Sequence, residues 1–196
     1  MPNRKGKESY LKMSEAAFNF HQTNPSFWYQ KSVSLYASAA IIWEARHGRR
    51  NQEFISSLGL KQEFCVDTGC EHPYLMTMGL SYEVILKAIC ITEDKDYPKN
   101  HDLQSLAKLV DIKFTNIEKD QLLLLSEFIA WEGRYPVPKR HQQLTQHWNA
   151  TRKRLWETED IFGLEVTSRT NIFEHDSLKK LWLKLQDNYW ESRHKI

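Results

Sequence analysis

Residues 75–91 read LMTMGLSYEVILKAICI, an almost uninterrupted apolar run. Its only charged side chains are Glu83 and Lys87, which are spaced i,i+4 and therefore lie on one face of a helix. A helix that is apolar nearly all round belongs at the centre of a domain. We therefore expect a buried central helix around which the rest of the chain packs.

Helical patterns continue on both sides of this run. Upstream, apolar residues recur at helical spacing over 28–46, and Pro25 separates this segment from a basic N-terminal arm. Downstream, we expect helices over 103–110, 118–132, 138–156 and 174–193. Gly133 follows the expected helix over 118–132 in the position of a C-cap, and Pro138 suits the first turn of the expected helix over 138–156. Residues 157–171 show only a weak pattern.

These elements predict an all-α protein, an up-and-down bundle of four to five core helices with an N-terminal arm and an extra C-terminal helix. A length of 196 residues suits a single domain spanning residues 1–196. We assign residues 25–157 to the core, with an insertion over about 47–73, and residues 158–196 to a helical extension. The small numbers of Gly and Pro, 7 and 6, favour helices over a turn-rich β protein.

Composition indicates the cellular setting. A hydrophobic content of 41% and a charged content of 27% are typical of soluble globular proteins, and a net charge of +2 indicates no particular partner. Three cysteines without a disulfide framework favour a reducing compartment, and the polar N-terminus lacks the apolar segment of a signal peptide. We expect a cytoplasmic protein that makes no membrane contact.

Four polar residues near the central helix each have two interpretations. Glu83 and Lys87 form either an internal ion pair or a buried polar element at a dimer seam or ligand cleft. His101 and Asp102 precede a predicted helix, where a short acidic side chain accepts hydrogen bonds from free backbone N–H groups. The alternative for that pair is catalysis. We assign structural roles to all four.

Residues 133–156 contain no Asp or Glu. A segment of one charge sign in a near-neutral protein suits a phosphate backbone, and the alternative is a solvated face neutralised by acidic neighbours. The candidate RNA- or nucleotide-binding residues are Lys139, Arg140, His147, Arg152, Lys153 and Arg154. Helical spacing predicts an inner stripe of His141, Leu144, Trp148, Thr151 and Leu155, and an outer stripe of Arg140, His147 and Arg154.

A metal site is not expected. Cys65, Cys70 and His72 could supply three zinc ligands, but structural zinc sites have four and no fourth ligand is evident. We predict neither a metal nor a cofactor.

The order of these motifs resembles the HEPN superfamily over roughly residues 28–156. The resemblance lies in a Glu-x-x-x-Lys pair in an apolar helix, then His-Asp-Leu, then a helix ending in Arg-Tyr-Pro. The residues that carry it are Glu83, Lys87, His101, Asp102, Leu103, Arg134, Tyr135 and Pro136. The resemblance implies a homodimeric helical bundle that contacts RNA or a nucleotide in a defence or stress-response setting, with a possible antitoxin-like protein partner.

Many HEPN proteins cleave RNA without metal, using an Arg-x(4–6)-His motif assembled across the dimer. Six residues separate Arg134 from His141 here. By resemblance, Arg134 would stabilise the phosphate charge and His141 would act as acid or base. The alternative is that His141 is a helix-end histidine and that Arg134 pairs with a helix end. The Arg-Tyr-Pro form, with Tyr135 in a structural role, is similar to members that are not known to cleave.

Three functions therefore remain open. The first is a HEPN-like protein that binds RNA or a nucleotide without catalysis. The second is an active metal-independent endoribonuclease that uses Arg134 and His141. The third is a non-enzymatic, oligomeric protein-interaction module.

Overall fold

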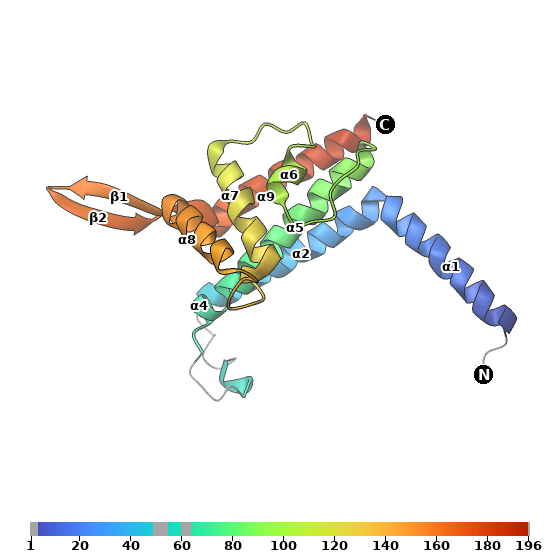
Figure 1. Cartoon of the computed structure of the whole chain (residues 1–196), viewed down its shortest axis with the longest axis horizontal. Coiled ribbons are helices and arrows are strands. Elements are labelled where there is room, and N and C mark those ends of the chain that lie inside the picture. Colours follow the sequence, from blue (N-terminus) through green and yellow to red (C-terminus); the bar gives the residue numbers. More distant parts are fainter. Residues whose placement is uncertain (1–3, 49–54, 60–63, 196) are drawn as a thin grey trace.

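The computed structural model describes residues 4–48, 55–59 and 64–195, and helices dominate it (Figure 1). The helices are α1 (Arg4–Thr23), α2 (Pro25–His47), α4 (Val66–Gly69), α5 (Glu71–Thr92), α6 (Leu103–Ala107), α7 (Asn116–Glu127), α8 (His141–Leu155) and α9 (His175–His194). The shorter elements are a π-helical turn η1 (Phe128–Glu132), a 3-10 turn η2 (Asn171–Phe173) and the antiparallel strands β1 (Trp156–Ile161) and β2 (Leu164–Arg169). The predicted all-α bundle is confirmed, with one small two-stranded sheet added to it.

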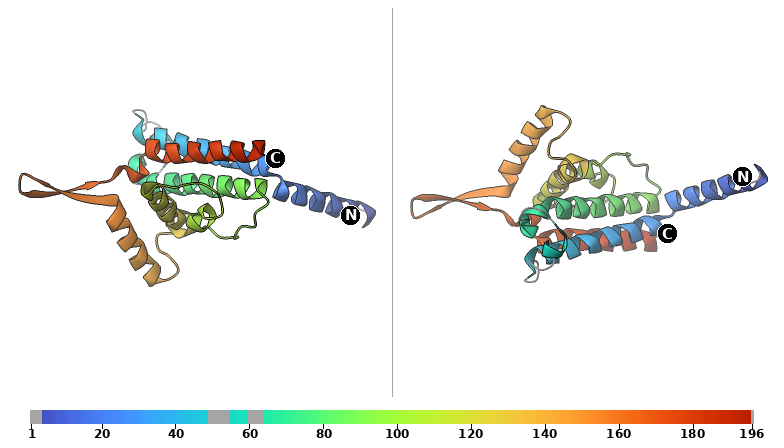
Figure 2. Two further views of the ribbon diagram at one scale, coloured as in Figure 1. Left: turned by 90° about the horizontal axis from the view of Figure 1, so that it is seen from above. Right: turned by 90° about the horizontal axis from the view of Figure 1, so that it is seen from below.

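The central element is α5, as its sequence predicts. It packs along α2 on one side and against α9 and the α7–η1 segment on others (Figures 1 and 2). Fourteen of its 22 residues are buried. Gly79 permits the contact with η1, since a Cβ atom at this position would lie 2.9 Å from Cγ1 of Ile129.

The start of α5 differs from the prediction. The helix begins at Glu71 instead of residue 75, and α4 occupies part of the segment before it. The predicted insertion over about 47–73 lies partly outside the described residues. The stretch Val66–Thr92 is long and apolar enough to cross a membrane by length and composition, but 72% of its most apolar window is buried in the fold. That burial is what the core helix of a bundle shows.

The N-terminal arm is a longer helix than expected. α1 runs away from the bundle, and the chain bends where α2 begins (Figure 1). Asn24 caps α2, because its Oδ1 accepts a hydrogen bond from the Ser26 backbone N–H at 3.0 Å. The break predicted at Pro25 is therefore present.

Local caps set the ends of the shorter helices. Asp102 starts α6 by accepting from the Ser105 backbone N–H at 3.1 Å, and Thr115 and Glu118 form a capping box at the start of α7. Gly133 follows η1 with a φ of −75°, so it is not the left-handed C-cap that we expected. A side chain at Gly133 would clash with Met76, and close approach to α5 explains the glycine.

A β-hairpin occupies the weakly patterned segment. β1 and β2 pair in register from Trp156 opposite Arg169 to Ile161 opposite Leu164. Phe162 and Gly163 form the turn with φ values of 57° and 82°, as a two-residue hairpin turn of type I′ requires. The hairpin projects from the bundle, and both strands are exposed along their whole length (Figures 1 and 2).

Candidate functional site

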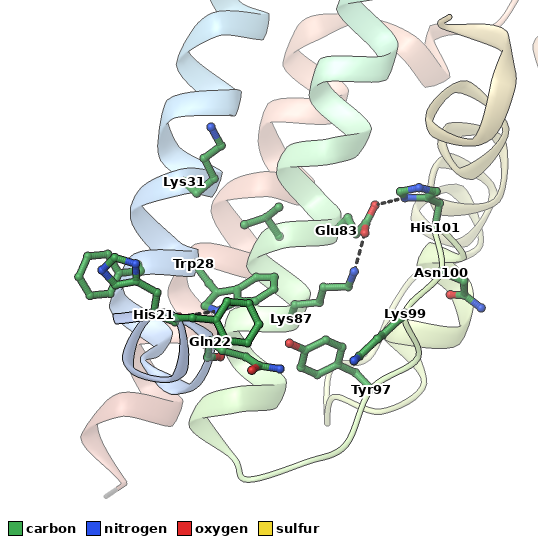
Figure 3. Close-up of a pocket in the computed structure, with 13 residues that line it drawn as sticks. His21, Gln22, Trp28, Lys31, Glu83, Lys87, Tyr97, Lys99, Asn100 and His101 are labelled. Carbon is green, nitrogen blue, oxygen red and sulfur yellow. Dashed lines mark hydrogen bonds and ion pairs between the residues drawn. The ribbon is translucent and has the colours of Figure 1, made fainter. Parts of the chain in front are cut away.

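A polar cluster lies on α5 near the end of the bundle from which α1 departs. Lys87 Nζ lies 2.6 Å from Glu83 Oε1, and His101 Nδ1 lies 2.8 Å from Glu83 Oε2 (Figure 3). Glu83 is only 5% exposed, so its carboxylate depends on these two basic partners. The internal ion pair expected for Glu83 and Lys87 is present.

The cluster forms part of the wall of a cavity of about 540 Å³. α1, α2, α5 and the loop before α6 surround this cavity (Figure 3). Its lining residues are Phe18, His21, Gln22, Phe27, Trp28, Lys31, Glu83, Val84, Lys87, Tyr97, Lys99, Asn100 and His101. The volume lies within the range of small-molecule sites.

Aromatic side chains provide the apolar part of the lining. Trp28 and Tyr97 meet edge to face with ring centroids 6.0 Å apart. Trp28 Nε1 donates to the carbonyl oxygens of His21 and Gln22, each at 3.2 Å, which fixes the end of α1 beside the cavity. Burial raises the pKa of the Tyr97 phenol further above neutrality, and its hydroxyl can donate a hydrogen bond.

Basic side chains outnumber acidic ones in the lining. Lys31 and Lys99 are exposed and form no ion pair with any described residue, and Lys87 lies 5.7 Å from the centre of the Tyr97 ring. Glu83 is the single carboxylate and is already neutralised by Lys87. The cavity therefore combines an apolar, aromatic body with a positive rim.

His101 and Asp102 point to different partners and do not form a pair. Asp102 accepts from both the backbone N–H and the hydroxyl of Ser105. Burial acts to raise the pKa of Asp102, but these hydrogen bonds outweigh it and the pKa is lowered overall. Asp102 is thus an N-cap, whereas His101 reaches back to Glu83 and belongs to the cavity.

The predicted catalytic residues Arg134 and His141 are not joined by any hydrogen bond. Arg134 Nη2 donates to the carbonyl oxygens of Ile129 and Ala130 at 2.8 and 2.7 Å, and its guanidinium lies 5.5 Å from the centre of the Tyr135 ring. His141 is the exposed first residue of α8. The geometry corresponds to the alternative in which Arg134 binds the carbonyl groups at a helix end.

His147 corrects the predicted faces of α8. It is buried, its Nε2 lies 2.8 Å from Glu132 Oε2, and its ring packs against Trp131 and Phe128. Trp148, predicted to face inward, is 62% exposed. The contact with Glu132 explains the inversion, because a histidine beside a carboxylate can be buried. His147 is therefore not positioned to contact RNA.

The remaining predicted RNA-binding residues fall into two groups. Arg154 forms an ion pair with Asp120 and is half-buried. Lys139, Arg140, Arg152 and Lys153 are exposed and form no ion pair with a described residue. Four of the six predicted residues are thus available to a partner at the surface.

Sequence reasoning missed most of the cavity. Trp28, Lys31, Tyr97 and Lys99 come from two segments that are far apart in the chain. The sequence singled out Glu83 and Lys87, a pair of charges in an apolar run, and His101 in the loop before α6. Comparisons with family models, curated proteins and solved structures found no match. The HEPN resemblance therefore stays a prediction based on the motifs.

Proposed function

We propose that this is a HEPN-like protein that binds a nucleotide unit, free or at an exposed position of an RNA strand, without cleaving it. The observation that carries this proposal is the cavity beside α5, where aromatic rings and three lysines surround one neutralised carboxylate. The resemblance places this binding in a defence or stress-response setting.

The aromatic walls suit the base of a nucleotide. Nucleobases stack on aromatic side chains with little sequence preference, and each such contact contributes about 1–3 kcal/mol. Trp28 and Tyr97 meet edge to face in the wall of the cavity (Figure 3). Phe18 and Phe27 line it from α1 and α2. A flat, partly apolar ring therefore has several surfaces to contact.

The lysines suit the phosphate. Lys31 on α2 and Lys99 in the loop before α6 line the cavity from different sides, and neither forms an ion pair with a described residue (Figure 3). Glu83 does not oppose an incoming anion, because Lys87 and His101 already contact both of its oxygens. An anionic ligand with an aromatic body matches both parts of the lining.

The positions of the two predicted catalytic residues support binding without cleavage. Arg134 already donates to two backbone carbonyl groups, and the exposed side chain of His141 on α8 forms no hydrogen bond with a described residue. An arginine that stabilises a transition state needs its donors directed at the reacting phosphate. Within these contacts, the ribonuclease alternative would leave Arg134 only its Nε and Nη1 donors for a phosphate.

Titration calorimetry with adenosine and guanosine monophosphates and with a short single-stranded RNA would test the proposal. We expect Lys31→Ala and Lys99→Ala each to weaken binding by on the order of tenfold, as loss of a charge-assisted contact does. Lys179→Ala and Lys180→Ala, on the exposed side of α9, are matched controls that should not change affinity. Binding of mononucleotides alone would identify a free nucleotide as the ligand, and binding of both would indicate an RNA strand.

Failure of every nucleotide and RNA to bind would contradict the proposal. A cleavage assay in the presence of EDTA separates the catalytic alternative. RNA cleavage that is lost in both Arg134→Ala and His141→Ala would establish the ribonuclease and overturn the non-catalytic assignment.

A further inference from the structure

One face of the hairpin is apolar and acidic, and it is exposed along its length. The register places Glu157, Glu159 and Ile161 on the same side of the ribbon as their respective partners Ser168, Val166 and Leu164. Leu164 is 70% exposed, and Phe162 at the tip is fully exposed. A two-stranded ribbon is marginally stable alone in water, so a surface of this kind suits a partner.

The hairpin also has unpaired negative charge. Its four carboxylates, Glu157, Glu159, Asp160 and Glu165, form no ion pair with a described residue, and its single cation, Arg169, is paired with Glu71. The ribbon projects away from the body (Figure 2). At its base Glu157 lines a hollow together with Lys153 and Arg154 of α8, whereas both strands are exposed along their length. Its natural complement is a surface with exposed apolar side chains and positive charge.

α8 is such a surface. His141, Thr145, Trp148 and Arg152 follow one another at helical spacing and are all exposed. Unpaired cations at Arg140 and Arg152 stand before and after Trp148 along the chain, and residues 133–156 contain no Asp or Glu. The exposed face of α8 thus presents a large aromatic ring between positive charges.

We propose that the acidic, apolar face of the hairpin docks on the exposed face of α8 of a second copy of this chain. Both surfaces belong to one chain, and α8 runs directly into β1, so the hairpin leaves the body at the end of α8 (Figure 1). In two copies related by a two-fold axis, the hairpin of each copy contacts α8 of the other. This reciprocal arrangement is an isologous dimer. The proposal does not depend on the nucleotide site.

The dimensions of the two elements agree. A six-residue strand extends about 20 Å, and a fifteen-residue helix extends about 22 Å. Glu157 and Glu159 lie toward the base of the hairpin, and Ile161 and Leu164 lie toward its tip. Trp148 is the anchor in this arrangement, because exposed tryptophans in the centre of an interface contribute much of its affinity.

Charge exchange tests the docking. Sedimentation equilibrium of the full chain would be measured for wild type, for a hairpin variant, Glu157→Lys with Glu159→Lys, and for a helix variant, Arg140→Glu with Arg152→Glu. We expect the wild type to dimerise, and each variant alone to have a dissociation constant raised at least on the order of tenfold. Mixing the two variants restores both contacts in a heterodimer, and one chain carrying all four changes restores the homodimer.

Matched controls separate this effect from net charge. Asp187→Lys with Glu191→Lys and Lys179→Glu with Lys180→Glu make the same charge changes at exposed positions of α9 and should leave association unchanged. Circular dichroism would verify that every variant is folded. A wild type that stays monomeric, as expected if α8 serves RNA or another protein, would overturn the proposal. A mixture of the two variants that fails to associate would do the same.

Discussion

α5 and the β-hairpin show two opposite ways in which this chain places charge beside apolar side chains. In α5 the charged residues Glu83 and Lys87 are buried and bonded to each other. In the hairpin the carboxylates are exposed and unpaired, and apolar residues such as Phe162 lie in solvent beside them. Changes in α5 should therefore alter the stability of the chain, and changes in the hairpin should alter its association.

The largest expected effect is on the buried ion pair. Lys87→Met leaves the carboxylate of Glu83, which is 5% exposed, with His101 as its only basic partner. Removing one partner of a buried pair lowers the free energy of unfolding by about 3 kcal/mol. Urea denaturation would measure the loss, and Lys99→Met, at an exposed site in the same cavity, serves as the control. A loss below about 1 kcal/mol would show that Glu83 is better solvated than its burial indicates.

Replacing a glycine by alanine in the core and in the hairpin compares the two regions, because the added methyl group should destabilise each site for a different reason. In Gly79→Ala the new Cβ would lie 2.9 Å from Cγ1 of Ile129, and this overpacking should lower the free energy of unfolding by about 1–2 kcal/mol. In Gly163→Ala the space is open, but the φ of 82° strains the turn by about 1 kcal/mol. Hydrogen exchange should detect the second change only at hairpin amides, and a global effect would show that the hairpin folds with the core.

Acid pH gives a smaller effect that again distinguishes the body from the hairpin. Burial acts to raise the pKa of Glu118, but hydrogen bonds from Lys184 and Thr115 lower it overall. A lowered pKa in the folded state stabilises the fold above the unfolded value and loses that contribution as pH falls through the folded value. Glu118→Gln should therefore lower stability by about 1 kcal/mol at neutral pH, allowing for solvent screening.

The difference between Glu118→Gln and wild type should shrink as the pH falls below about 4, the ordinary range for a glutamate. Glu159→Gln, in the hairpin, is the matched variant and should leave stability unchanged across the same range. Urea denaturation at a series of pH values would measure both. A constant deficit of Glu118→Gln at every pH would mean that the lost interaction is not ionic.

The smallest expected effect is at the tip of the hairpin. Phe162 is fully exposed, so Phe162→Ser should change the stability of the monomer by less than about 0.5 kcal/mol. Thermal unfolding should be measured in dilute solution, where association does not contribute. A large loss under those conditions would place Phe162 in a contact within its own chain.

The sequence predicted those parts of the fold in which local chemistry and burial agree. The apolar run with one ion pair identified α5, and Asp102 identified the start of α6. His147 and Trp148 were placed on the wrong faces, because periodicity does not reveal that Glu132 offers a buried partner. The cavity was missed because it is formed by residues from distant segments, which only the fold brings together.

The hairpin was missed for a different reason. Two-residue turns of this type usually carry Asn or Asp before Gly, whereas Phe162 takes the first left-handed position here. Its strands face solvent on both sides, so they lack the alternation of buried and exposed residues that marks a strand in a sheet. The turn residues are atypical and the strands have no buried face, so the sequence contains little signal that predicts this hairpin.

The hydrogen bonds at the base of the hairpin determine how this segment could be re-engineered. The Thr170 backbone N–H donates to the Leu155 carbonyl at 2.9 Å, and the Thr170 hydroxyl donates to the Arg154 carbonyl at 2.9 Å. The chain therefore leaves α8 and returns toward α9 at nearly the same point. We expect residues 157–168, which exclude the Arg169–Glu71 ion pair, to be a modular segment that can be shortened or replaced while the connection between the two helices keeps its geometry.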